Sequence, residues 1–286
     1  MMLALLLLAC GPSTDTGAGA DLGTCDASGG RSFWALSALR FAPIEDNISD
    51  GFDLDGDETE TGDSSGCGVG DAVSPSGTGG IDNAFGRMLP ALESTEFAAA
   101  DGLLAAMISS GELLLVAEVS GIDDWSDDGC VSAAMYRGIG APMLTTDGFI
   151  LPDQTLELDQ GFDNQFFPQT ALESGSVEGR PLNTVMPLQI LNASFDFPMT
   201  KGAIRYDLHE DGTMSGVLAG GIGVQYLVDL LNEEADGVDD SLVALFESLL
   251  PVLADLEPDA SGACTRLSAT MAFDAVPVFV YEDTLD

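Results

Sequence analysis

Residues 50–92 contain the feature that most constrains this chain, an acidic loop with carboxylates on alternate residues. Asp53, Asp55 and Asp57 follow directly after Phe52. Carboxylates this close repel one another, and a calcium ion, which takes about 6–8 oxygen ligands, relieves that repulsion. We therefore expect a calcium-organised loop, in which the ion rather than hydrophobic packing holds the segment around Phe52 in shape.

Further ligands are expected from the second half of this segment, where a Gly/Ser/Pro-rich stretch leads into a helical pattern. The EF-hand template fails, because Glu58 stands where glycine is required and Ser64 stands where a bidentate glutamate is required. Ligands must then arrive from elsewhere in the segment. The alternative is a solvated acidic loop in which Asp82 only caps a helix. The expected ligand set is Asp53, Asp55, Asp57, Asp71, Asp82 and Asn83.

The overall charge of the chain excludes some partners. Lys+Arg of 8 against Asp+Glu of 48 give a formal net charge of −40, while 45% of the residues are hydrophobic and the mean hydropathy is +0.21. Charge-driven disorder needs low hydrophobicity, so we expect a folded protein with an acidic surface. Nucleic acid is excluded as a partner because phosphate binding needs clustered basic residues, and Lys201 is the single lysine.

The amino terminus indicates export. Residues 1–9 form a short apolar segment, and the sequence Leu-Leu-Ala-Cys that ends at Cys10 resembles the lipobox of bacterial lipoproteins. The resemblance implies cleavage before Cys10, acylation of that residue, and contact with a membrane through the lipid anchor alone. Residues 10–24 are small and polar, and predict a flexible tether. An ordinary signal peptide, with Cys10 incidental, is the alternative.

Four further cysteines suggest two disulfides, because export leads to an oxidising compartment. Three connectivities are open. We favour Cys67–Cys130, which would fasten the acidic loop to a strand pair, and Cys25–Cys264, which would join the two ends of a domain.

Hydrophobic periodicity predicts a mixture of strands and helices. Residues 31–43 alternate like a strand, with a helix as the alternative, and Glu210-Asp211-Gly212 predicts a tight hairpin turn. Residues 112–140 and 188–221 share a plan of strand, acidic turn, strand and glycine. Helical spacing is found over residues 82–92, 94–110, 222–232 and 242–256, and further strands are expected over residues 267–273 and 276–281.

The middle of the chain, residues 141–187, is rich in proline and turn residues, which favours short edge strands and loops. Strands and helices in separate blocks favour a mainly β protein with helices (α+β) over a βαβ arrangement. We expect one acidic β-rich domain over residues 25–286. Its architecture should be a β-sandwich or a bent antiparallel sheet with three or four packed helices.

Sequence motifs for catalysis are mostly absent. No Gly-x-Ser-x-Gly, HExxH or phosphate-binding loop is found. His209 is the only histidine, and its place at a predicted turn favours an exposed side chain. Two other acidic groups are weaker ion-site candidates: Asp123, Asp124, Asp127 and Asp128, with Trp125 among them, and the group Asp159, Asp163 and Asn164.

The acidic segment also carries a family resemblance. The run Gly-Phe-Asp-Leu-Asp-Gly at residues 51–56, the Cys-Gly at 67–68, the Ser-Pro-x-Gly at 74–77 and the Gly-Ile-Asp-Asn at 80–83 resemble uncharacterised surface lipoproteins of myxobacteria-type bacteria. The resemblance covers residues 34–92. It implies a cell-envelope location and the acidic loop as a unit, and it implies no reaction.

These observations lead to one functional hypothesis and two alternatives. The first is a non-catalytic, lipid-anchored protein of the cell envelope, at the outer membrane or cell surface, whose calcium-binding loop supports adhesion or the capture of an extracellular glycan or protein. The second is a secreted hydrolase acting on polysaccharide, with structural calcium and a catalytic carboxylate pair. The third is a structural envelope component without a specific ligand.

Overall fold

The structure is a computed structural model that describes residues 29–63, 67–92, 96–190, 193–233, 240–281 and 284. The expected signal peptide, Cys10, the tether and Cys25 lie outside the described residues. The strands are β1 (Arg31–Phe41), β2 (Leu115–Ser120), β3 (Asp128–Ile139), β4 (Thr155–Leu158), β5 (Gln165–Glu173), β6 (Ser176–Ile190), β7 (Ala193–Leu208), β8 (Met214–Gly223), β9 (Leu256–Pro258) and β10 (Cys264–Val280). The helices are α1 (Ala84–Leu92), the 3-10 turn η1 (Glu96–Ala99), α2 (Ala100–Ser110), α3 (Val224–Glu233) and α4 (Asp240–Leu253).

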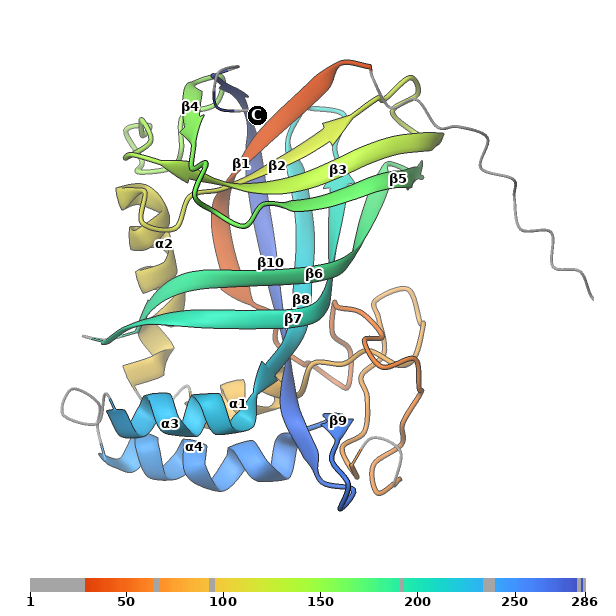
Figure 1. Ribbon diagram of the computed structural model, residues 1–286, viewed down its shortest axis with the longest axis vertical. Helices are drawn as coiled ribbons and strands as arrows, with labels where there is room; N and C mark the ends of the chain where they lie inside the picture. Colours follow the sequence, from red (N-terminus) through yellow and green to blue (C-terminus); the bar gives the residue numbers. More distant parts are fainter. Residues whose placement is uncertain are drawn as a thin grey trace, which may run out of the picture.

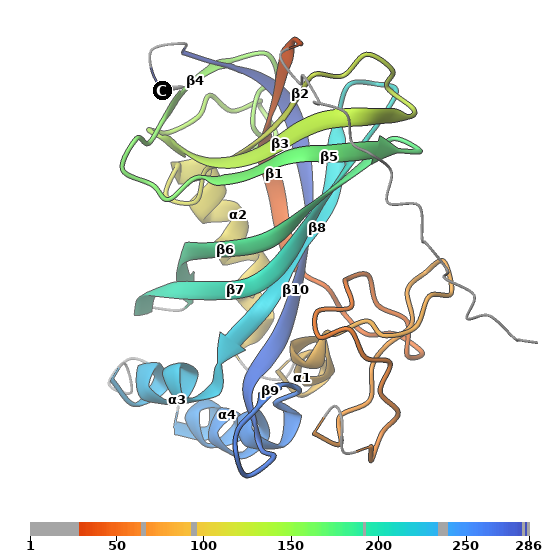
Figure 2. The same cartoon turned by 45° about the vertical axis from the view of Figure 1, so that its right-hand side comes forward.

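Eight of the strands form a closed antiparallel barrel (Figures 1 and 2). The order around the barrel is β1, β2, β3, β5, β6, β7, β8 and β10, and the pairing of β10 with β1 closes the ring. The expectation of a β-sandwich or open bent sheet is therefore wrong. The protein is mainly β, with two strands outside the barrel ring and four short α-helices among the described residues.

Closure depends on a pairing that no local sequence pattern reveals. Phe33 of β1 lies opposite Val278 of β10, although the two residues stand at the two ends of the chain. Residues 267–273 and 276–281, expected as two strands, belong almost entirely to the single strand β10. One long strand can pair with both β8 and β1, whereas two short strands would have left an edge.

The middle of the chain contains the expected loops over residues 141–154 and 159–164 and the short strand β4. It also contains β5 and most of β6, which are strands of the barrel wall and not short edge strands. Pro181 lies inside a register shift between Gly179 and Leu182, and Pro168 lies opposite a register shift in β3. Proline is tolerated at such irregularities because no ladder hydrogen bond is needed from it there. Pro168 and Pro181 therefore mark irregularities within long strands.

Strand β4 lies outside the barrel ring and joins two of its strands. It pairs with β3 through Gly138–Leu158 and with β10 through Phe279–Thr155. It thus bridges the outer side of β1 and β2, which explains why the outward-facing Ala35 and Val116 are completely buried. Strand β9 pairs with the beginning of β10.

The barrel interior is filled with side chains. Tyr206 of β7 is completely buried, and its hydroxyl donates a hydrogen bond of 3.1 Å to the carbonyl of Ala134 in β3, on another part of the wall. Gly179 leaves the room that the ring of Phe167 occupies, since a Cβ on this glycine would lie 2.4 Å from the ring. An eight-strand barrel of this kind is a packed core.

The four expected helices are confirmed, with shifted ends. Helix α2 contacts both β1 and β6, which lie on opposite sides of the ring, so it packs across the barrel rather than on one face. Helices α1, α3 and α4 gather at the lower end of the barrel in Figure 1. The strand over residues 31–43 and the turn at residues 210–212 are also confirmed, as β1 and the β7–β8 connection.

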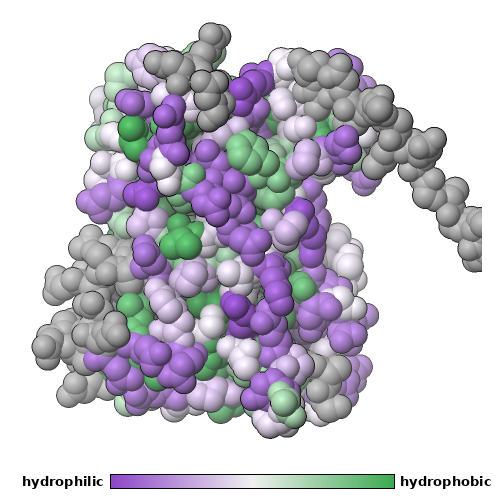
Figure 3. All heavy atoms as spheres, viewed as in Figure 1, coloured by the Kyte–Doolittle hydropathy of each residue, from purple (hydrophilic) through white to green (hydrophobic). Residues whose placement is uncertain are grey.

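The surface agrees with the acidic composition. On the face shown in Figure 3, hydrophilic residues predominate and hydrophobic residues form small, separate patches. Among the described residues, none of the helices combines the length and the apolar character needed to cross a bilayer.

Candidate metal centre

The acidic loop lies against the outside of the barrel, where its base is anchored by packing. Phe52 is buried against Ala203 of β7 and against Val217 and Ala219 of β8. Arg180 of β6 lies over the Phe52 ring, 5.2 Å from its centroid, and its Nη1 donates a 2.9 Å hydrogen bond to the carbonyl of Asp53. The expectation that an ion instead of hydrophobic packing holds this segment is therefore wrong for its base.

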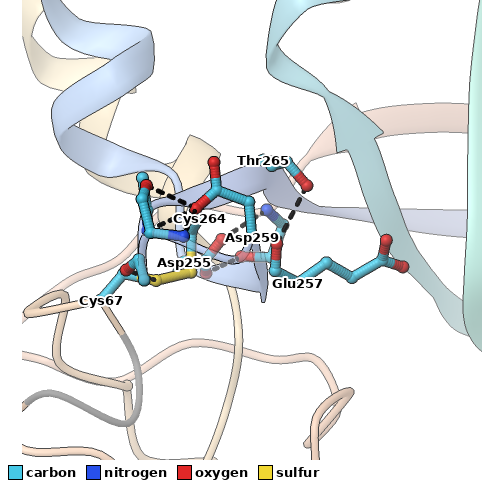
Figure 4. The surroundings of a disulfide bond; sticks show 10 residues. Cys67, Asp255, Glu257, Asp259, Cys264 and Thr265 are labelled. Carbon is cyan, nitrogen blue, oxygen red and sulfur yellow. Dashed lines mark hydrogen bonds between the residues drawn. A yellow bond between two sulfur atoms is a disulfide. The ribbon is translucent and has the colours of Figure 1, made fainter.

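A disulfide joins the far part of the loop to the barrel. Cys67 is bonded to Cys264 at the beginning of β10, a sequence separation of 197 residues (Figure 4). The expected pairs Cys67–Cys130 and Cys25–Cys264 are therefore wrong. Cys130 is itself disulfide-bonded. Spacing along the chain carries no information on connectivity, because the fold decides which cysteines meet.

The β9–β10 connection presents Cys264 to the loop on a rigid support. Asp259 accepts hydrogen bonds from the amides of Ser261 and Ala263, and the hydroxyl of Thr265 donates to the carbonyl of Glu257 (Figure 4). The Glu257 carboxylate in turn forms ion pairs with Lys201 and Arg266. The acidic loop is thus fixed at Phe52 and at Cys67, with Asp53, Asp55 and Asp57 between these two anchors.

Three carboxylates of the segment meet. Asp53, Asp55 and Asp82 each present an oxygen within 4.8 Å of the others, and this is the group among the described residues that could hold a metal ion. Asp82 is buried, while Asp53 and Asp55 reach the surface. One oxygen of each accepts a backbone amide: Gly56 to Asp53, Asp57 to Asp55 and Leu54 to Asp82. These bonds orient the carboxylates and keep further oxygens available as ligands.

The glycine-rich part of the segment closes over this group. Gly80 has a φ of 78°, and a Cβ there would lie 3.5 Å from the Asp53 carboxylate and 3.3 Å from the carbonyl oxygen of Asp57. The left-handed conformation and the close approach both favour glycine. The Gly/Ser/Pro-rich stretch therefore brings Asp82 back beside Asp53 and Asp55.

The electrostatics of the group are unfavourable without a cation. Burial, together with the neighbouring carboxylates of Asp255, Asp55 and Asp71, raises the pKa of Asp82 to about 8, although the hydrogen bond from the Leu54 amide opposes this shift. Burial, followed by the charges of Asp53 and Asp57, also raises the pKa of Asp55. Within the described residues no basic side chain forms an ion pair with Asp53, Asp55 or Asp82.

Two other expected ligands lie near the group but are engaged differently. Asp71 accepts the amide of Thr59 at 2.6 Å, and burial together with Asp55 and Asp53 raises its pKa. The side chain of Asn83 donates to the carbonyl of Ala42 and accepts the amide of Gly86, so it caps α1. The structure thus brings Asp71 beside the three carboxylates and assigns Asn83 to the fold.

Asp57, also an expected ligand, is not part of the three-carboxylate group. Its backbone amide donates to Asp55, and its side chain is exposed. The alternation of acidic residues therefore brings the first two carboxylates together with Asp82 and leaves out the third.

Sequence reasoning missed Asp255. This residue is 5% exposed, and burial raises its pKa to about 7. It accepts hydrogen bonds from the amide and the hydroxyl of Ser268, and that hydroxyl accepts the amide of Ala84 at the start of α1. No local signal separates Asp255 from the other acids, because only the fold brings it behind Asp82.

Thr59 was also missed. Its hydroxyl is buried and has no hydrogen-bond partner, although the backbone of the same residue is bonded to Asp71. Buried hydroxyls normally have a partner, so this oxygen adds a free acceptor close to the acidic residues.

The two weaker ion-site candidates form local turns. In the β2–β3 connection, Asp124, Asp127 and Asp128 accept backbone amides of Ser126, Ser174 and Asp123. In the other group, Asp159 accepts the amide of Gly161. The four aspartates of the first group do not form a three-carboxylate cluster like that of Asp53, Asp55 and Asp82 among the described residues.

His209 is exposed at the β7–β8 turn, as expected. Its Nε2 lies 2.9 Å from the hydroxyl of Ser215.

Comparisons with protein-family models, with curated proteins and with solved structures find no match for this chain. A functional proposal therefore rests on the residues and contacts described above.

Proposed function

We propose that the protein is a non-catalytic, lipid-anchored protein of the cell envelope that holds calcium in its acidic loop and uses the stabilised barrel for adhesion or ligand binding. The lipobox-like residues before Cys10 support the envelope location. The Cys67–Cys264 disulfide is consistent with export to an oxidising compartment.

The observation that carries the proposal is the meeting of Asp53, Asp55 and Asp82 without a paired basic residue among the described residues. Asp82 is 2% exposed, and an isolated buried carboxylate is strongly disfavoured unless a cation compensates it. A divalent ion would compensate all three at once.

Calcium suits this group better than the other common biological metals. The three donor groups that meet are all carboxylates, and among the described residues no histidine or cysteine joins them. Such hard oxygen donors favour calcium or magnesium over zinc and copper. Calcium also tolerates irregular coordination, whereas magnesium demands an octahedron.

A bound ion would connect two parts of the loop that already have separate anchors. Asp53 and Asp55 follow Phe52, which packs on β7 and β8, and Asp82 directly precedes the cap of α1. An ion between them would hold the loop against the barrel and the helix together. This region would then present one fixed surface.

The test is thermal unfolding of the full chain in detergent, with calcium, with magnesium and with chelator. Calcium at about 100 times its Kd should stabilise the folded state by about 2.7 kcal/mol. Asp55→Asn should abolish most of this increase while leaving the fold intact, because Asp55 is exposed.

The matched control is Glu60→Gln, which removes one negative charge from an exposed residue of the same loop. It should keep the calcium response. Equal melting temperatures with calcium and with chelator, together with the absence of bound metal after native purification, would contradict the proposal.

A further inference from the structure

A pocket of about 580 Å³ lies at the upper end of the barrel in Figure 1, away from the acidic loop. It is formed where β1 begins and β10 ends, together with the β2–β3 connection and the β7–β8 turn. The mouth of a β-barrel is a frequent place for small-molecule sites, and this volume is typical of them.

Three of the rarest side chains of the protein meet in this pocket. The whole sequence has two tryptophans and one histidine, and Trp34, Trp125 and His209 all contribute to the lining. They come from β1, the β2–β3 connection and the β7–β8 turn. Phe279 of β10 lines the same pocket.

The aromatic residues divide into a floor and a rim. Trp34 is 3% exposed, and its indole Nε1 donates a 2.9 Å hydrogen bond to the carbonyl of Gly212, which fixes the ring. Trp125 and Phe279 are 55% and 59% exposed. Large aromatic side chains left this open beside a pocket indicate a contact surface for a ligand.

The polar lining disfavours an anionic ligand. Ser32 offers a hydroxyl and Asp153 a carboxylate, while the hydroxyl of Thr213 and the imidazole of His209 line the pocket with partners of their own in Asp211 and Ser215. Arg31 also lines the pocket, but its guanidinium is already neutralised by the Glu118 carboxylate at 2.7 Å. A protein of net charge −40 also repels anions, so an anionic ligand is disfavoured.

We propose that this pocket binds a ring of a neutral saccharide. The C–H face of a pyranose ring is apolar and slightly positive, and it stacks on the negative face of an aromatic ring. The hydroxyls at the edge of the sugar would pair with the hydroxyl, imidazole and carboxylate groups of the lining. The open rim leaves room for the rest of a longer glycan to continue into solvent.

This inference rests on the proposed function, because it names the class of ligand that the barrel would bind. The pocket and the candidate metal centre share no residue. Saccharide binding measured both with calcium and with chelator therefore separates the two. Binding without any calcium response would contradict the ion site alone, and a calcium response without binding would contradict the pocket alone.

The experiment is a titration of the full chain in detergent with a panel of neutral gluco-, xylo-, manno- and chito-oligosaccharides, followed by tryptophan fluorescence and calorimetry. Both tryptophans line the pocket, so the fluorescence reports on this site. At least one neutral saccharide should change the emission and bind saturably. Trp125→Ala should weaken its binding about tenfold or more, with Trp34 still present as the reporter.

The matched control is Phe149→Ala, which removes an aromatic side chain that is 64% exposed and outside the pocket. This variant should bind as the unchanged protein does. Absence of binding across the panel, equal affinity in Trp125→Ala, or binding of only uronic-acid saccharides or fatty acids would each overturn the proposal.

Discussion

Two buried carboxylates of this protein have opposite surroundings. Glu118 in β2 is 5% exposed and accepts two hydrogen bonds of 2.7 Å from Arg31 and one of 2.7 Å from the hydroxyl of Tyr136. Asp82 is 2% exposed, accepts one amide, and faces other acids. The barrel wall thus contains the counter-charge of Glu118, whereas no basic side chain among the described residues forms an ion pair with Asp82.

Strand pairing explains the completeness of the Glu118 site. Phe33 lies opposite Glu118, and Arg31 is the diagonal neighbour on the same face of β1 and β2, within reach of a long side chain. Burial and the bond to Glu118 raise the pKa of Tyr136, so its hydroxyl remains a donor. Asp82 lies in a loop, where no such ladder brings a partner.

The largest effect on stability is expected from removing the charge of Glu118, whose partners are Arg31 and Tyr136 of the barrel wall. Glu118→Gln should lower the free energy of unfolding by about 3 kcal/mol, because it leaves the Arg31 charge without its bidentate partner. Arg31 is 38% exposed and keeps some access to water, which places the loss at the low end of the range for buried pairs. Denaturant unfolding with and without calcium measures it, and the loss should be the same in both.

The control for Glu118 is the exposed pair Arg40–Asp274, whose side chains are 47% and 54% exposed. Asp274→Asn should cost less than about 1 kcal/mol. A loss for Glu118→Gln that disappears in calcium would show that the two carboxylate sites are coupled, and the comparison would fail.

The second effect concerns pH. The pKa of Asp82 is about 8 and that of Asp255 about 7, both above the ordinary aspartate value. Between about pH 4 and these values the folded protein therefore binds more protons than the unfolded chain, so its stability decreases as the pH rises. In chelator, the free energy of unfolding should fall by at least about 1 kcal/mol per pH unit from pH 5 to 8, since each linked proton contributes about 1.4 kcal/mol per pH unit; denaturant titration measures this.

Calcium should flatten this dependence, because it stabilises the charged carboxylates and lowers their pKa values. Stability in chelator that stays constant or increases from pH 5 to 8 would show that the loop compensates its acids without an ion.

The third effect is an increase in the free energy of unfolding, whereas the first is a decrease. Asp82→Asn keeps an acceptor for the amide of Leu54 and removes a buried charge. In chelator at pH 8 it should raise the free energy of unfolding by about 2 kcal/mol, because residue 82 then carries no buried carboxyl that has to lose a proton. In calcium the variant should be less stable than the unchanged protein. Melting curves under both conditions show whether Asp82→Asn stabilises the protein in chelator and destabilises it in calcium.

Local features of this protein could be predicted from its sequence, because they depend on neighbours in the chain. Helical spacing identified α1, α2, α3 and α4, and the Glu-Asp-Gly turn identified the β7–β8 hairpin. The acidic alternation and the return of the chain at Asp82 identified all three members of the carboxylate group. These features come from periodicity and from loop chemistry.

Features that depend on distant pairing could not be predicted. The closing pair of β1 with β10, the disulfide of Cys67 with Cys264 and the ion pair of Arg31 with Glu118 each join residues far apart in the sequence. The prolines of residues 141–187 were misleading for the same reason, because a bulge in a long strand and a break between short strands contain the same residues.

The smallest expected effect tests whether the structure or the alternation of acidic residues in the sequence identifies the ligands. Asp57 continues the alternation of Asp53 and Asp55, but it lies outside the group that could hold an ion. Asp57→Asn should therefore change stability in calcium by less than about 0.5 kcal/mol, as for a surface substitution, and should keep most of the calcium response. Calcium titration of the two variants side by side measures this. A loss of affinity as large as that of Asp55→Asn would show that the ion draws Asp57 inward and that the loop rearranges on binding.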